Sequence, residues 1–200
     1  MDQLVEDTKP NSLFTCVIPA RGGSKRVKNK NKRLFNGIPL FDYALRAAIN
    51  SKIFTMIIVS SNDRDILAHT YSYFSTQIVQ PHKRPSVLCA DNIPLKVAVR
   101  YCLQAYKAEE LTYLLQPTNP FVTSKQIVEA RDVFKKKDPN YLIGMNKGKD
   151  IGFHIFKKSW FLKEYDKDFY GTNWIPYEMD GIDIDTEEEW EEAERLFRER

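Results

Sequence analysis

Apolar residues along the chain gather into short continuous runs rather than into strictly alternating patterns. The three longest runs begin at residues 13, 55 and 111, and each contains β-branched or aromatic residues. Runs of this kind are typical of strands that are buried on both faces of a parallel sheet. The pattern predicts strands at 13–18, 55–60, 76–79, 111–116, 141–145 and 151–156.

Helical periodicity fills most of the stretches between these strands. The predicted helices are 39–51, a segment capped by Asn62 or Asp63 and running toward 74, the second part of 91–107, 124–137, and a last helix that starts at Thr186. Thr186 and Glu189 have the spacing of a capping box. Alternation of strands and helices predicts an α/β fold with a largely parallel sheet that is covered on both faces. Ligands bind such sheets beyond the carboxyl ends of the strands, so we expect the chemistry in the loops after residues 18, 60, 116 and 182.

Length and composition fit a single domain with a sizeable core, since 42% of the 200 residues are hydrophobic. We expect residues 1–11 to form a flexible tail and residues 12–200 to form the domain. No apolar run approaches the ~18–20 residues that cross a bilayer, and the N-terminus lacks the apolar core of a secretion signal. Three cysteines without a CxxC pair indicate neither a disulfide framework nor a zinc site. We therefore expect a cytoplasmic protein with no membrane partner.

The net charge of +3 arises in one segment. Residues 21–33 contain seven Lys or Arg and no acid, whereas the rest of the chain has a net charge of −4. A nucleic-acid-binding protein more often spreads its positive charge over a whole face, so we expect no nucleic-acid partner. A concentrated basic loop suits a compact polyanion such as a nucleoside triphosphate.

This basic loop follows directly after the first predicted strand. Gly22 and Gly23 allow backbone N–H groups to approach an anion closely. The side chains that can add charge or a hydroxyl donor are Arg21, Ser24, Lys25 and Lys30. Such groups hold a triphosphate and stabilise pyrophosphate as it leaves. The spacing fits neither GxxxxGK[ST] nor GxGxxG, and the alternative of a plain basic surface loop is disfavoured by its place after a buried strand.

Two aspartates near the end of the chain indicate a metal site. Asp183 and Asp185 are separated by one residue, and in an extended segment such residues point to one face. Two hard carboxylates suit Mg²⁺, which binds through one or two carboxylates together with phosphate oxygens and water. The alternative is that Asp185 and Thr186 only cap the following helix, an explanation that does not extend to Asp183.

The basic loop carries a family resemblance. Residues 19–25 read PARGGSK, and Lys30-Asn31 follows four residues later. This arrangement resembles the opening motif of the acylneuraminate cytidylyltransferase family, which makes CMP-activated nonulosonic acids. The resemblance implies a Rossmann-like three-layer nucleotidyltransferase fold, CTP as the nucleotide and Mg²⁺ as cofactor. It assigns contacts with the phosphates and sugar of CTP to Arg21, Ser24, Lys25, Lys30 and Asn31. Arg26 stands where the sialic acid enzymes usually have glycine, which looks more like the pseudaminic acid branch.

Further motifs of that family follow in order. They are VSSND at 59–63, RPSVLCAD at 84–91, LLQPTNP at 114–120 and GIDIDT at 181–186. On this resemblance Arg84 approaches the cytosine and Asp91 orders the loop. Gln116 helps to place the acceptor sugar, and Asp183 and Asp185 hold the metal.

The segment between Gln116 and Asp183 is short, because family members carry a longer stretch there that includes an arm exchanged between subunits. Here the strands predicted at 141–145 and 151–156 follow one another almost directly. We expect a reduced arm around 141–156. Formation of a homodimer is therefore possible but not required, and Lys147 and Lys149 could partly replace the arm.

These features together predict an enzyme that transfers CMP from CTP to a nonulosonic-type acidic sugar and releases pyrophosphate. Two alternatives stay open. The first is a nucleotidyltransferase that acts on another small acid or sugar phosphate. The second is a CTP-binding relative without turnover, which the reduced arm suggests.

Overall fold

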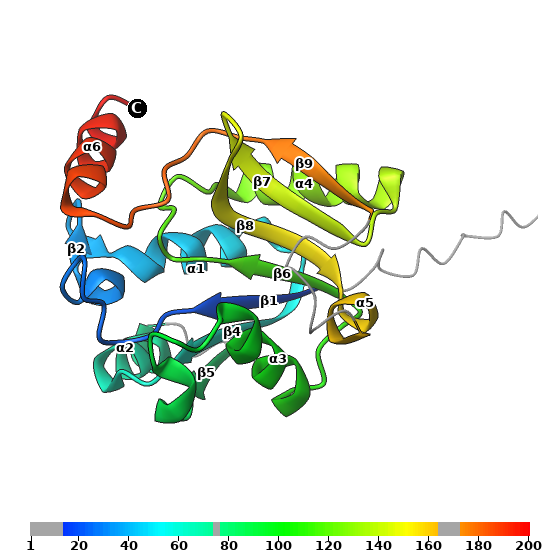
Figure 1. The fold of residues 1–200 in the computed structure, drawn as a ribbon, viewed down its shortest axis with the longest axis horizontal. Helices are drawn as coiled ribbons and strands as arrows, with labels where there is room; N and C mark the ends of the chain where they lie inside the picture. The colour runs from blue at the N-terminus through cyan, green and yellow to red at the C-terminus, as the bar shows by residue number, and fades with distance from the viewer. Residues whose placement is uncertain (1–13, 74–76, 164–172) are drawn as a thin grey trace, which may run out of the picture.

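The computed structural model describes residues 14–73, 77–163 and 173–200, and the predicted tail at 1–11 lies outside these ranges. Its main feature is a seven-stranded sheet with the order β5-β4-β1-β6-β8-β7-β9 (Figure 1). The strands of this sheet are β1 (Phe14–Pro19), β4 (Phe54–Ser61), β5 (Val79–Lys83), β6 (Leu111–Leu115), β7 (Tyr141–Asn146), β8 (Lys149–Lys157) and β9 (Trp174–Glu178). A small antiparallel pair is formed by β2 (Leu34–Phe35) and β3 (Ile38–Pro39).

The sheet is mostly parallel, as the sequence predicts. Strand β1 lies between β4 and β6 and is parallel to both, and β5 extends the parallel set beyond β4. Strand β8 is antiparallel to both β6 and β7, whereas β9 is parallel to β7. The carboxyl ends of β1, β4, β5 and β6 therefore meet at one edge of the sheet, which is where such folds bind ligands.

Helices cover both faces of the sheet and produce three layers (Figure 1). The helices are α1 (Leu40–Ser51), α2 (Arg64–Tyr73), α3 (Leu95–Ala105), α4 (Ser124–Lys137), α5 (Lys158–Lys163) and α6 (Glu187–Arg198), with 3₁₀ turns at Lys30–Lys32 and Ser86–Cys89. Cys16 and Ile18 of β1 point into the core shared with α1, α2 and α4. Val17, between them, points into the core shared with α3 and α5. This alternation explains why β1 is apolar along its whole length.

One predicted strand is misplaced. The sequence predicts a strand at 76–79, but β5 spans Val79–Lys83, and residue 76 lies outside the described residues. Pro81, His82 and Lys83 interrupt the apolar run and conceal the strand. An edge strand tolerates proline because only one of its sides must pair, and β5 is at the edge. The correction matters for function, since it places Arg84 directly after a parallel strand.

Strands β7 and β8 form a tight hairpin. Asn146 pairs with Lys149, and only Lys147 and Gly148 lie between the strands. Both turn residues have positive φ, 49° and 80°, as a two-residue type I′ turn requires. The hairpin turn lies at the same edge of the sheet as the carboxyl ends of the parallel strands, because β7 runs antiparallel to β8 and β8 antiparallel to β6.

Helix α6 packs on a third, smaller core beside the sheet. Trp190 and Ala193 of α6 contact Phe35 and Leu40 there, together with Ile184 from the preceding segment. This packing fixes the residues just before α6 against the edge of the sheet. Within the described ranges, no helix combines the length and hydropathy that a membrane crossing needs.

Candidate functional site

A cavity of about 540 Å³ opens at the carboxyl ends of the parallel strands. Four segments that are distant in the sequence contribute to its wall: the loop after β1, the segment after β5, the loop after β6 and the segment before α6. The predicted site residues that line it are Arg21, Ser24, Lys25, Lys30, Asn31, Arg84, Asp91, Gln116, Asp183 and Asp185. Gly22 and Gly23 line an adjoining hollow that shares Arg21, Lys25 and Asp91 with the first. The structure thus brings the predicted residues together.

The glycines of the basic loop are held by the loop after β4. The Gly22 N–H donates to Asn62 Oδ1 over 2.9 Å, and a Cβ on Gly22 would lie 3.1 Å from Asp63 Cβ. Gly23 has a φ of +78°, which favours glycine. Asn31 donates from Nδ2 to the Arg21 carbonyl over 2.8 Å and closes the loop from its other side. Asn62 is a site residue that the sequence analysis considered only as a helix cap. Asp63 is the residue that caps α2, since its Oδ1 accepts from two N–H groups of the first turn.

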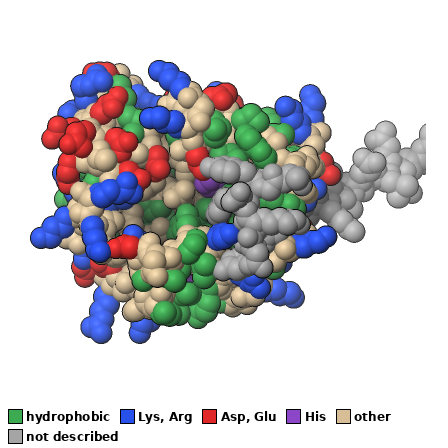
Figure 2. Space-filling model, in the orientation of Figure 1, with side chains coloured by type: hydrophobic (Ala, Val, Ile, Leu, Met, Phe, Trp, Pro, Cys, Tyr) green, Lys and Arg blue, Asp and Glu red, His purple; other side chains and the backbone are tan. Residues whose placement is uncertain are grey.

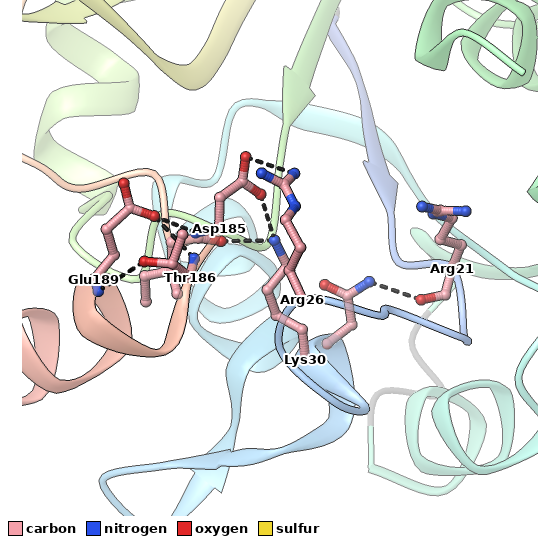
Figure 3. A network of polar contacts seen from close by, with 8 residues as sticks. Arg21, Arg26, Lys30, Asp185, Thr186 and Glu189 are labelled. Atoms are coloured by element: carbon pink, nitrogen blue, oxygen red, sulfur yellow. Dashed lines mark hydrogen bonds and ion pairs between the residues drawn. The ribbon is translucent and has the colours of Figure 1, made fainter. Parts of the chain in front are cut away.

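Four cations of the basic loop are paired with two aspartates of the cavity wall. Arg21 and Lys25 contact Asp91 over 2.8 and 2.7 Å, and these contacts hold the pKa of Asp91 below its usual value, Lys25 contributing most. Arg26 and Lys30 contact the two oxygens of Asp185 over 2.9 and 2.8 Å (Figure 3). Basic and acidic side chains also lie interspersed at the left of the face drawn in Figure 2. Two carboxylates thus face four cations, so these contacts offset part of the loop's positive charge and leave an excess of it.

Lys30 is the most buried cation of the loop. Its ammonium donates to the Ile184 carbonyl over 2.6 Å and to Asp185 Oδ1 over 2.8 Å, and its side chain is 10% exposed. The 3₁₀ turn that starts at Lys30 directs the side chain inward. Lys30 thus joins the basic loop to the segment that carries both candidate metal ligands.

Asp183 and Asp185 both line the cavity but differ in their surroundings. Asp185 is fully engaged by Arg26 and Lys30. Asp183 Oδ1 is buried and, within the described part of the chain, meets no hydrogen-bond partner. Burial raises the pKa of Asp183, and the negative charge of Asp185 adds to this effect despite a contact with Thr118. A buried carboxylate oxygen without a partner is costly, and a divalent cation would satisfy it.

The described residues contain no cluster of three or more His, Cys, Asp or Glu side chains that could hold a metal by themselves. Two carboxylates are nevertheless the donor set that Mg²⁺ uses when a substrate phosphate supplies further oxygens. The residues present therefore fit a cation that arrives with a triphosphate.

Arg84 is a buried part of the wall of the cavity. Its Nε donates to Ser60 Oγ over 3.1 Å and its Nη2 donates to the Ser60 carbonyl over 2.9 Å, and the residue is 3% exposed. Burial lowers the pKa of its guanidinium. Ser60 lies next to the last residue of the parallel strand β4, so the contact fixes a cation in the cavity wall near the carboxyl end of this strand.

The sequence predicts that Lys147 helps to replace the reduced arm at the acceptor site, but the structure places Lys147 elsewhere. It lines a separate hollow of about 440 Å³, together with Asp180, Glu192 and Arg200. Neither Lys147 nor Lys149 is among the residues that line the main cavity. The two-residue turn directs this end of the hairpin toward α6 rather than toward the basic loop.

The residues before α6 are held by its cap. Thr186, rather than Asp185, is the N-cap, and it forms a capping box with Glu189. Glu189 Oε2 also accepts from the Asp185 N–H over 2.8 Å (Figure 3). The cap therefore fixes the backbone that carries the candidate metal ligands.

Thr186→Ala is expected to lower the free energy of unfolding by about 1 kcal/mol, the usual cost of losing such a cap. Thermal denaturation would measure the loss. Thr186→Ser keeps the hydroxyl acceptor and is expected to retain most of the stability. Equal losses in both variants would show that the hydroxyl is not the stabilising group.

Comparisons with known proteins agree with this site. A sequence profile described as cytidylyltransferase matches residues 15–192. N-acylneuraminate cytidylyltransferase of Escherichia coli is 34% identical over 120 residues, which cover 60% of this chain and 28% of that protein. Pseudaminic acid cytidylyltransferase of Campylobacter jejuni is 31% identical over 131 residues, which cover 64% of this chain and 55% of that protein. The chain thus spans well under two thirds of the length of either curated relative.

Solved structures share the fold. CMP:2-keto-3-deoxy-manno-octonic acid synthetase, solved with CTP, superposes with a TM-score of 0.74 at 13% identity, covering 94% of this chain and 99% of that one. A Mycobacterium tuberculosis protein, solved as a complex with manganese, superposes with a TM-score of 0.68 at 13% identity, covering 92% and 98% of the two chains. The likeness confirms the predicted Rossmann-like nucleotidyltransferase fold.

Proposed function

Because the chain belongs to the cytidylyltransferase family, we propose that it transfers CMP from CTP to an acidic sugar of the nonulosonic type and releases pyrophosphate. The relatives named for N-acylneuraminate and pseudaminic acid support the acceptor class. The observation that carries the proposal is a single cavity that joins a basic glycine-containing loop, two aspartates and a glutamine at the edge of a parallel sheet.

The basic loop binds the triphosphate in this proposal. Gly23 and Ser24 offer backbone and hydroxyl donors, whereas the Gly22 N–H is engaged by Asn62 and helps, with Asn31, to fix the loop. The cations that take the phosphate charge are Arg21, Lys25 and Lys30. Once these groups face the phosphates, they stabilise the charge that develops on the leaving pyrophosphate.

Nucleotide binding would then be an exchange of ion pairs. Arg21 and Lys25 contact Asp91 in the free protein, and Arg26 and Lys30 contact Asp185. A triphosphate replaces the carboxylates as the partner of these cations. Asp185 is released from part of its pairing at the moment when a metal accompanies the nucleotide.

Asp183 and Asp185 would hold a divalent cation, with magnesium as the expected physiological ion. A cation there neutralises phosphate charge and orients the reacting groups. The unpartnered buried oxygen of Asp183 supports this assignment. Manganese in a structure of the same fold is compatible with a divalent ion.

Arg84 would recognise the cytosine of CTP, and Gln116 would help to place the acceptor sugar. Arg84 is a buried cation beside the expected position of the cytosine, where a guanidinium can donate to ring oxygen and nitrogen atoms. Gln116 follows β6 and lies on the side of the cavity nearest to the β7–β8 hairpin. Only Lys147 and Gly148 separate β7 from β8, so this hairpin itself carries no inserted arm. We propose that residues 12–200 act as one domain, with or without a homodimer.

Release of pyrophosphate tests the proposal. CTP and Mg²⁺ would be combined with sialic, pseudaminic and legionaminic acids, and with the shorter acid Kdo. Turnover is expected with CTP and at least one nonulosonic acid, and little with ATP, GTP or UTP. Turnover with another nucleotide or with a sugar phosphate would favour a different nucleotidyltransferase. CTP binding without turnover on any acceptor would favour a CTP-binding protein.

A further inference from the structure

A glycine in β8 leaves the space that the side chain of Gln116 occupies. Gly152 has a φ of +74°, and a Cβ on it would lie 2.7 Å from Gln116 Cβ and 3.3 Å from Gln116 Nε2. The Gln116 N–H also donates to the Gly152 carbonyl over 2.8 Å. The side chain of Gln116 therefore lies directly over the glycine, in space that any other residue would fill.

Asp150 and His154 flank this space. Strand β8 is irregular here, since its register with β7 shifts between the pairs Ile143–His154 and Met145–Asp150 and Gly152 has a positive φ. This irregularity brings Asp150 and His154 closer together than two residues four positions apart lie in a regular strand. His154 Nε2 lies 3.5 Å from Gln116 Nε2 and 3.5 Å from Asp150 Oδ1. Asp150 Oδ1 also accepts from the Gly152 N–H over 2.9 Å, which fixes the carboxylate beside the glycine. His154 is 1% exposed, whereas the side chain of Asp150 is 27% exposed.

The donors and acceptors of Asp150, His154 and Gln116 determine how their side chains are oriented. An ionised carboxylate only accepts, so His154 Nε2 must carry the proton that faces Asp150. The amide atom placed beside this N–H is Gln116 Nε2, which can only donate. Because amide orientation is assigned from the surrounding hydrogen-bond network, the oxygen rather than the nitrogen of the Gln116 amide belongs at this position. The amide NH₂ of Gln116 is left to face the cavity, where it can donate to an oxygen of an acidic acceptor.

We infer that Asp150 and His154 are positioning residues that hold the amide of Gln116 in the orientation that receives the acceptor. The inference rests on the proposed function for the identity of the acceptor. Neither residue is expected to touch the nucleotide, so their effect should fall on the acceptor alone.

The surroundings favour a neutral imidazole in this role. Burial lowers the pKa of His154, while the charge of Asp150 opposes the shift. The ring of Tyr141 on β7 lies 5.7 Å from that of His154. Asp183 lies farther along the cavity and experiences the charge of Asp150. A neutral imidazole with a fixed tautomer orients an amide without adding charge to the acceptor end.

The test uses three variants of the whole chain. Asp150→Ala removes the carboxylate, and His154→Phe removes the ring nitrogens but keeps a buried ring. Asp150→Asn keeps an oxygen for the Gly152 N–H and for His154. Asp180→Ala is the matched control, because Asp180 is an exposed aspartate in the neighbouring hollow. The readouts are KM for the acceptor, KM for CTP, and the side-chain amide signals of Gln116 in NMR spectra, assigned with Gln116→Ala.

Asp150→Ala and His154→Phe are expected to raise the acceptor KM about tenfold, since misplacing one positioning group costs one to two orders of magnitude. KM for CTP should stay within about twofold. The two amide proton signals of Gln116 should collapse toward those of a free glutamine, and Asp150→Asn should restore both signals and KM.

Two results would overturn the inference. One is an unchanged Gln116 amide in both Asp150→Ala and His154→Phe. The other is an equal rise in KM for CTP and acceptor, which would indicate general damage to the domain. If the wild-type chain turns over no acceptor, the proposed function fails, yet the Gln116 signals still decide whether Asp150 and His154 fix the amide.

Discussion

Asp183→Asn is expected to reduce turnover with CTP and Mg²⁺ by about 10²- to 10³-fold, the usual loss when one preorganised group that stabilises developing charge is removed. Asparagine has nearly the same shape but cannot offer a negatively charged oxygen to a divalent cation. Affinity for CTP measured without a metal should change little, because the basic loop is intact. The measurement is steady-state pyrophosphate release over a range of Mg²⁺ concentrations.

The same substitution is expected to stabilise the free protein by a few degrees in melting temperature. Burial raises the pKa of Asp183, so its ionised form is less favourable in the folded than in the unfolded chain. This penalty is fully present above the raised pKa and disappears as pH falls below the ordinary carboxyl value of 3.8. The advantage of Asp183→Asn should therefore be largest at neutral pH and should vanish in acid.

Asp180→Asn is the control for both effects, since Asp180 is exposed and lines the other hollow. It should change neither turnover nor melting temperature appreciably. If Asp183→Asn kept full turnover at every Mg²⁺ concentration, Asp183 would not be a metal ligand. If it destabilised the free protein at neutral pH, its carboxylate would have a structural role.

Lys30→Met is expected to lower kcat/KM for CTP by about 10²- to 10³-fold. Methionine keeps the length of the side chain but removes the ammonium that contacts Ile184 and Asp185. It leaves a buried carbonyl without its donor, so we also expect a loss of about 1–3 kcal/mol in the free energy of unfolding. Kinetics with CTP and denaturation in urea would measure the two losses separately.

Lys28→Met is the matched control, because Lys28 belongs to the same loop but is exposed. A loss in Lys28→Met as large as in Lys30→Met would mean that the loop acts only through its total charge. A loss of stability without a loss of kcat/KM in Lys30→Met would assign Lys30 a purely structural role.

Much of the fold could be predicted from the sequence because local and tertiary preferences agree. The helix at 124–137 has the predicted bounds, with a capping box at Thr123 and three lysines in its last turn. The strand at 79–83 was misplaced because an edge strand needs no continuous apolar run. The strand at 174–178 was missed for a related reason, since its residues alternate between exposed and half-buried positions.

The sequence predicts which residues belong to the site but not how their side chains contact one another. Motifs identified the basic loop, Arg84, Gln116 and the aspartates, and the structure brings them to one cavity. The sequence could not show that Asp185 is paired with Arg26 and Lys30 while Asp183 is not, because this difference depends on contacts across 150 or more residues of chain. It also gave no role to Asp150 or His154. The spacing of Asp150, Gly152 and His154 is visible in the sequence. It indicates a role near the acceptor only when Gln116 is known to lie over the glycine.

Crystallography of the chain with CTP and Mn²⁺ tests the central claim most directly, because anomalous scattering locates the metal without assumptions about the nucleotide. The account predicts one anomalous peak about 2.0–2.3 Å from a carboxylate oxygen of Asp183, with the triphosphate against the basic loop and with Arg21 and Lys25 turned from Asp91 toward phosphate. A metal bound away from both Asp183 and Asp185, or a nucleotide outside the cavity between the basic loop and Gln116, would contradict it.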